Sequence, residues 1–114
     1  MIKKLDLNAL EQPTLELTLL DKDKTTFRLV CPDVKLGERF MAASRELSAV
    51  QTSGDAKAIK KLYALTAEVI SCNLDGIDVT AEELRDKYGV KFVHLIFIFK
   101  DYLDFIKEIN EAKN

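Results

Sequence analysis

Two short segments near the N-terminus alternate apolar and polar residues. Their apolar positions are Leu15, Leu17 and Leu19 in the first segment and Phe27, Leu29 and Cys31 in the second. Residues two apart lie on one face of a β-strand, so both segments predict strands with one buried face. The polar run Asp21–Lys24 between them favours a turn, and we expect a β-hairpin over residues 14–31. Two strands alone are marginal in water, so the leucine face should pack on helices.

After Pro32 and Asp33 the apolar spacing changes to three or four residues, which is typical of helices. We expect a first helix that starts between Val34 and Leu36 and ends near Gln51. Its apolar stripe consists of Leu36, Phe40, Ala43, Leu47 and Val50. A turn at residues 52–55, with Ser53 or Asp55 as N-cap, leads to a second helix that ends near Ser71. Its apolar arc consists of Ile59, Leu62, Tyr63, Thr66, Val69 and Ile70. The short connection predicts an antiparallel helical hairpin.

Residues 73–79 are expected to form a loop, with turn residues at Asp75 and Gly76, and a helix-start signal follows it. Thr80 and Glu83 have the spacing of a capping box, in which each side chain bonds the other residue's backbone N–H. We expect a short helix over Ala81–Tyr88, ended by Gly89 in the left-handed conformation.

The last predicted helix, Val90–Ile109, is the most apolar segment of the chain. Two neighbouring rows, one starting at Phe92 and one at Leu95, cover about half of its circumference, more than an ordinary surface helix needs. Val93 and Phe97 fall outside both rows, in the otherwise polar sector. We expect the turns up to Phe99 to be buried on every side and the later half to keep a polar side.

Two interpretations of this helix stay open. It is either the central helix of the bundle or the surface that meets another protein, because large exposed aromatic patches mark interfaces. The residues expected to contact a partner are Phe97, Tyr102, Phe105 and Ile109.

Together these elements predict an α+β fold, mostly α, with an N-terminal β-hairpin packed on a bundle of about four helices. We expect one domain over residues 1–114. It would comprise a loosely held arm (1–13), the hairpin (14–31), a helical part (34–109) and a frayed tail (110–114).

Charge and composition narrow the function classes. The chain has 17 Lys and Arg against 19 Asp and Glu, and 47% of its residues are hydrophobic, as in a folded soluble domain. It has no clustered positive charge of the kind that binds nucleic acid. The longest apolar run, Leu95–Phe99, is too short to span a bilayer, and no signal peptide is evident. We expect a cytoplasmic protein that binds neither nucleic acid nor membrane.

Residue types that carry catalysis or bind metals are sparse. Cys31, Cys72 and His94 are far apart in sequence and are too few for a structural zinc site, which usually takes four such ligands. We expect two reduced, partly buried thiols, although a single disulfide remains open. His94 has no neighbouring nucleophile and is expected to be a buried structural histidine. The sequence therefore predicts a non-enzymatic protein with no cofactor, no catalytic residue and no metal site.

The order of segments resembles a known family. A leucine-rich hairpin (Leu15–Cys31) precedes two helices, then the segment Asn73-Leu-Asp-Gly-Ile-Asp-Val-Thr-Ala-Glu-Glu-Leu84 and the aromatic stretch Phe92–Phe105. This layout resembles the small tail assembly chaperones of long-tailed phages and of prophages in Gram-positive bacteria, over about 100 residues.

The resemblance implies a non-catalytic protein that binds the tape measure protein, keeps it soluble and helps recruit tail tube protein. It also implies self-association into a homo-oligomer in the host bacterial cytoplasm. Two alternatives remain. The chain could be another small phage structural or head-tail completion protein that acts as an interaction module, or an enzyme of a type the sequence does not reveal.

Overall fold

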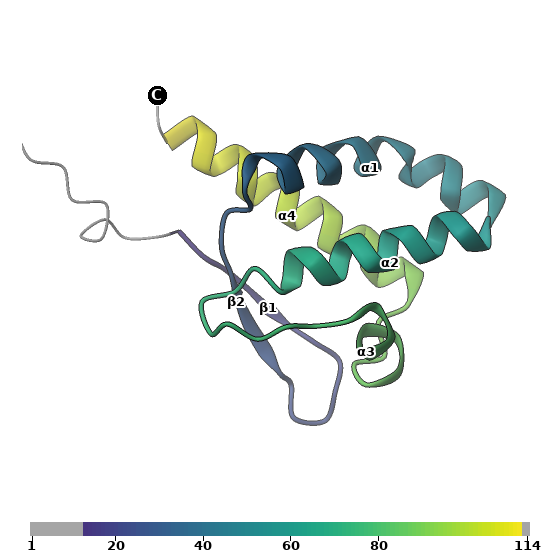
Figure 1. Cartoon of the computed structure of the whole chain (residues 1–114), viewed down its shortest axis with the longest axis horizontal. Coiled ribbons are helices and arrows are strands. Elements are labelled where there is room, and N and C mark those ends of the chain that lie inside the picture. The colour runs from purple at the N-terminus through teal and green to yellow at the C-terminus, as the bar shows by residue number, and fades with distance from the viewer. Residues whose placement is uncertain (1–12, 113–114) are drawn as a thin grey trace, which may run out of the picture.

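The computed structural model describes residues 13–112, with side chains as far as Ile109. Its elements in chain order are β1 (Leu15–Thr18), β2 (Thr26–Leu29), α1 (Val34–Ser53), α2 (Ala56–Ile70), α3 (Ala81–Asp86) and α4 (Phe92–Ala112) (Figure 1). The predicted fold class is confirmed: the molecule is mostly helical, with one antiparallel hairpin at its N-terminal end. The predicted arm lies outside the described residues except for Pro13.

The hairpin has the predicted strands and turn. Leu15 pairs with Leu29 and Leu17 with Phe27, so the apolar residues of both strands share one face. The turn is held by the Asp21 carboxylate, which accepts the Thr25 backbone N–H at 2.9 Å. Such local bonds make aspartate a favoured turn residue.

Segment 72–74 occupies the second edge of β2. The Val30 N–H donates to the Cys72 carbonyl and the Leu74 N–H to the Arg28 carbonyl, each at 3.0 Å. β2 is therefore enclosed on both sides, by β1 and by this segment.

α1 and α2 form the predicted helical hairpin, joined by a tight turn and running in opposite directions (Figure 1). The Asp33 carboxylate caps α1 by accepting the Leu36 N–H at 2.7 Å. Gly54 ends α1 with φ 65°, a left-handed conformation that costs glycine little. Of the two predicted N-caps of α2, Asp55 is the one observed, whereas Ser53 is the last residue of α1.

α3 begins with the predicted capping box, since the Thr80 hydroxyl accepts the Glu83 N–H and the Glu83 carboxylate accepts the Thr80 N–H, both at 3.1 Å. Gly89 has the predicted positive φ, 64°. The helix nevertheless ends at Asp86, two residues before the predicted end. The chain leaves it to bury Tyr88, whose ring meets Phe27 edge-on at 6.0 Å.

The start of α4 is also later than predicted, at Phe92 instead of Val90. Val90 belongs to the preceding loop, because both of its backbone groups bond outside α4. Its N–H donates to the Leu84 carbonyl at 2.8 Å, and its carbonyl accepts a hydrogen bond from the Tyr63 hydroxyl at 2.7 Å. At the other end the helix continues to Ala112, three residues beyond the predicted end at Ile109.

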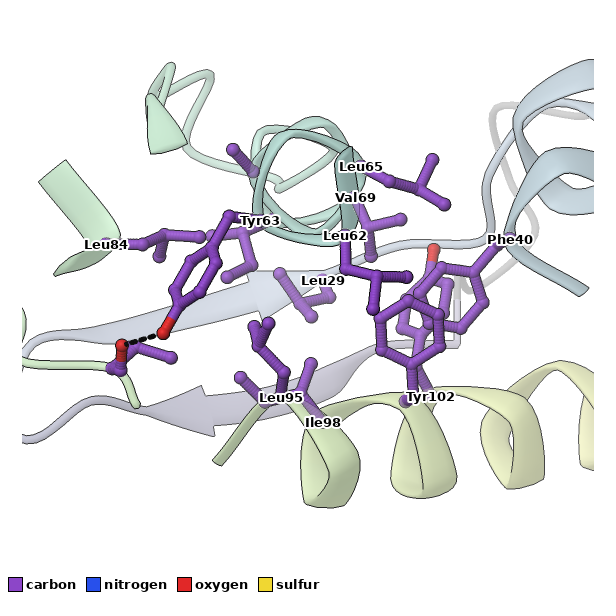
Figure 2. Packing of buried hydrophobic residues seen from close by; sticks show 14 of the residues in the cluster. Leu29, Phe40, Leu62, Tyr63, Leu65, Val69, Leu84, Leu95, Ile98 and Tyr102 are labelled. Carbon is purple, nitrogen blue, oxygen red and sulfur yellow. Dashed lines mark hydrogen bonds between the residues drawn. The ribbon is translucent and has the colours of Figure 1, made fainter. Parts of the chain in front are cut away.

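The core lies where α1, α2, α4 and the inner face of the hairpin meet. In Figure 2, Leu29 of β2 lies between Leu62 of α2 and Leu95 of α4. Phe40 of α1 stacks on Phe99 of α4 with ring centroids 4.1 Å apart. The predicted stripes of α1 and α2 therefore face inward, and α2 buries Leu65 and Ala67 as well.

Two expectations about burial are wrong. Cys31, expected on the inner face of the hairpin, is exposed, because β2 ends at Leu29 and the alternation ends with it. The first half of α4 is not buried on every side: Val93 is 50% exposed and Phe97 is 61% exposed.

Candidate functional site

An exposed apolar pair on α4 is the first component of the candidate site. Val93 and Phe97 lie one helical turn apart, so their side chains project from the same face. Within the same turns Leu95 and Phe99 are fully buried. A phenylalanine that is 61% exposed on an otherwise well packed helix loses the free energy of burial and therefore points to an interaction surface.

The exposed ring of Phe97 borders a groove between α4 and β1. One part of this groove, about 100 Å³, is lined by Leu15, Glu16, Leu17, Leu29, Phe97, Ile98 and Asp101. A second part, about 300 Å³, is lined by Thr14, Leu15, Asp101, Asp104, Phe105 and Glu108. The two parts share Leu15 and Asp101 and so adjoin; we call the two together the β1–α4 groove.

The rim of the β1–α4 groove is acidic. Its charged residues are Glu16 on β1 and Asp101, Asp104 and Glu108 on α4. Among the side chains described, the ion pairs join Arg28 to Asp75 and Arg39 to Glu68, so none of the four rim carboxylates is in one. Arg28, directly across the hairpin from Glu16, offsets part of that one charge. The three carboxylates on α4 and Glu16 together still give the groove a negative potential that favours a cationic partner.

The outer edge of β1 runs along this groove. The Leu19 N–H donates to the Thr25 carbonyl at 2.8 Å, which defines the hydrogen-bonded pairs of the ladder. Backbone groups alternate in direction along an antiparallel strand, so those of Glu16 and Thr18 point away from β2. Within residues 13–112 no strand pairs with this edge. It offers two N–H donors and two carbonyl acceptors to a partner.

Burial decreases across the sheet toward this edge. On the inner face Phe27 and Leu29 of β2 are 1% and 0% exposed, whereas Leu15 and Leu17 of β1 are only partly buried. The helices therefore cover the inner face of the hairpin fully at β2 but only partly at β1, which lies beside Phe97.

The four residues predicted to contact a partner differ in exposure. Phe97 is exposed at the groove and Ile109 is partly buried. Tyr102 and Phe105 belong to the core, with 0% and 7% exposure, so neither presents an exposed ring, although Phe105 lines the floor of the second part of the groove. Both rings pack inside: Tyr102 lies edge-on to Phe40, with centroids 5.1 Å apart.

The sequence contained one usable signal for this surface. Val93 and Phe97 stood out because they lie in the polar sector of the helical wheel, and both are exposed. Glu16 and Asp101 were not identified, since only the packing of β1 beside α4 brings them to one groove.

His94 and Cys72 are two of the residues considered above for catalysis or metal binding. The His94 imidazole accepts the Lys91 N–H through Nδ1 at 2.9 Å and so caps the first turn of α4. Burial raises the pKa of the Cys72 thiol, which disfavours the thiolate. Among the side chains described, no group of three or more His, Cys, Asp or Glu residues is placed to hold a metal ion.

A second hollow lies between α1 and α2, with a volume of about 550 Å³. Small side chains line it, including Ala42, Ala43, Ala58 and Ala64. It contains no exposed aromatic residue and adjoins no strand edge, so it is the weaker candidate for a binding surface.

Comparisons with known proteins give this chain no relative. No protein-family model matches it, and searches of curated proteins and of solved structures also found no match. In the part of the chain that the structure describes, no helix is long and apolar enough to cross a membrane.

Proposed function

We propose that the chain is a tail assembly chaperone of a long-tailed phage or prophage. In this role it binds the tape measure protein in the bacterial cytoplasm, assists tail tube assembly, self-associates and performs no catalysis. The order of segments, from the leucine-rich hairpin to the aromatic last helix, is the basis of the proposal.

The observation that carries the proposal is the exposed face of α4. A chaperone for a long apolar client needs an accessible apolar surface, and Phe97 at 61% exposure with Val93 at 50% provides one. The acidic rim beside it keeps such a surface hydrated and favours clients with basic residues.

Co-expression tests the proposal. The proposal predicts that a long coiled-coil-like client is encoded immediately downstream; the chain is produced together with that client, and the two are purified through a tag on the client. We expect co-purification with wild type and its loss with Phe97→Asp. Val34→Asp is the matched control, because Val34 is a 78% exposed apolar residue at the start of α1.

The proposal fails if both partners are folded and never associate. Recovery of the chain in purified phage particles would instead favour a head-tail completion protein, since an assembly chaperone leaves the particle.

A further inference from the structure

The hairpin is a two-stranded sheet whose inner face is incompletely covered at β1. β2 is enclosed by β1 on one side and by segment 72–74 on the other. β1 has one partner strand within residues 13–112, and its outer edge borders the β1–α4 groove. An unpaired strand edge is a template for another strand.

We infer that the outer edge of β1 binds an extended peptide segment of another protein, in which basic and apolar residues alternate, as a third strand of the sheet. This binding mode does not depend on the proposed function, because the edge can pair with such a segment whichever protein supplies it.

The position of the third strand follows from sheet geometry. Neighbouring strands lie about 4.8 Å apart, so an added strand would run along Glu16 and Thr18 and bond their outward backbone groups. Its inward side chains would extend the row of Leu15 and Leu17 and cover the exposed ring of Phe97. Apolar residues are needed at these positions, because they remove apolar surface from water.

The charges select the remaining positions. Side chains on the outer face of the added strand stand beside Glu16. Asp101, Asp104 and Glu108 lie on α4, on the inner side of the strand, and contribute to the negative potential of the groove as a whole. Lysine or arginine at alternate positions complements Glu16 and this negative potential.

A second copy of this chain fits the edge less well. A symmetric pairing of two β1 strands brings two acidic rims of the same composition together, and like charges across an interface are unfavourable. The charge of the groove therefore favours a basic segment from a different protein.

The test uses the full chain and a fluorescent probe peptide of about eight residues, alternating lysine and valine, a length that spans β1 and its flanks. Fluorescence anisotropy measures its affinity. Two comparison peptides have glutamate in place of lysine, or the same residues in two blocks. We expect each to bind at least about tenfold more weakly, because one reverses the charge and the other destroys the alternation.

A matched pair of proline variants locates the binding edge. Thr18 and Thr26 face each other across the hairpin, and both have backbone groups directed away from the partner strand. Thr18→Pro removes a donor from the outer edge of β1, and Thr26→Pro removes one from the opposite edge. We expect about a tenfold loss of affinity in Thr18→Pro and less than about a twofold change in Thr26→Pro, with circular dichroism showing both folded.

Four results would overturn the inference. The probe fails to bind the full chain; the three peptides bind equally; both proline variants lose binding to the same degree; or the chain forms dimers that Thr18→Pro alone dissociates. The last result would assign the edge to a second copy of the chain.

Discussion

The hydroxyl of Tyr102 donates a hydrogen bond to the backbone carbonyl of Val30 at 2.8 Å, joining residues 72 positions apart. The bond connects the middle of α4 to the end of the hairpin, and Tyr102 is completely buried. Burial also raises the pKa of this hydroxyl above its ordinary value, which favours the neutral, donating form. This contact explains why Tyr102 is part of the core and not of a partner surface.

Tyr102→Phe tests the contribution of this bond. Removing the hydroxyl leaves the Val30 carbonyl without this donor and should lower the free energy of unfolding by about 1 kcal/mol. Tyr63→Phe is the matched comparison, because the Tyr63 hydroxyl donates to the Val90 carbonyl at 2.7 Å. Urea denaturation measures both variants. A change below the error of the measurement in Tyr102→Phe would contradict this role.

Phe97→Asp and Phe105→Asp should differ in folding. Phe97 is exposed, so a charge there changes the free energy of unfolding by no more than about 0.5 kcal/mol. Phe105 is 7% exposed, and an unpaired charge at a buried position costs at least about 3 kcal/mol. Thermal unfolding followed by circular dichroism distinguishes them. If Phe105→Asp is as stable as wild type, Phe105 does not belong to the core.

Two glycine-to-alanine substitutions should change the free energy of unfolding in opposite directions. Gly37 lies inside α1, where an added Cβ would be 3.6 Å from the Pro32 Cγ, an ordinary contact; alanine there should stabilise the protein by about 0.5–1 kcal/mol. Gly54 has φ 65°, so alanine there should destabilise it by about 1 kcal/mol. Parallel urea titrations compare the two. Equal signs would contradict the conformations assigned to these positions.

The hairpin turn should respond to acid through Asp21. The Thr25 hydroxyl that donates to the Asp21 carboxylate lowers the pKa of this group below its ordinary 3.8. A lowered pKa in the folded state stabilises the fold above pH about 4, and this contribution is lost as the pH falls through the folded pKa. NMR titration should show a higher pKa for Asp21 in Thr25→Val than in wild type. An unchanged value would contradict the assigned cause.

Local signals in the sequence predicted the elements of the fold. The alternation of Leu15, Leu17 and Leu19 identified the first strand, and the Thr80–Glu83 spacing identified the start of α3. These predictions succeed because strand periodicity, capping and left-handed glycines depend on residues within a few positions of one another. Two helix ends differ from the prediction, the end of α3 at Tyr88 and the start of α4 at Val90. At both positions the residue makes a contact with a distant part of the chain that keeps it out of the helix.

The candidate site depended on contacts between distant segments. A helical wheel gives the relative angles of Phe97, Tyr102 and Phe105 on α4, but it does not show which angles the neighbouring elements cover. The edge-on contact with Phe40 and the bond to Val30 hold Tyr102 in the core, whereas coverage by the hairpin ends at β1 and leaves Phe97 exposed.

By itself, the sequence determined which segments are helices and strands and which faces of α1 and α2 are apolar, because these properties are local. Only the tertiary structure decided that Glu16 and Asp101, 85 positions apart, line one groove beside an open strand edge. The physical reason is that exposure and electrostatic potential depend on where packed elements stop covering one another, which no single segment encodes.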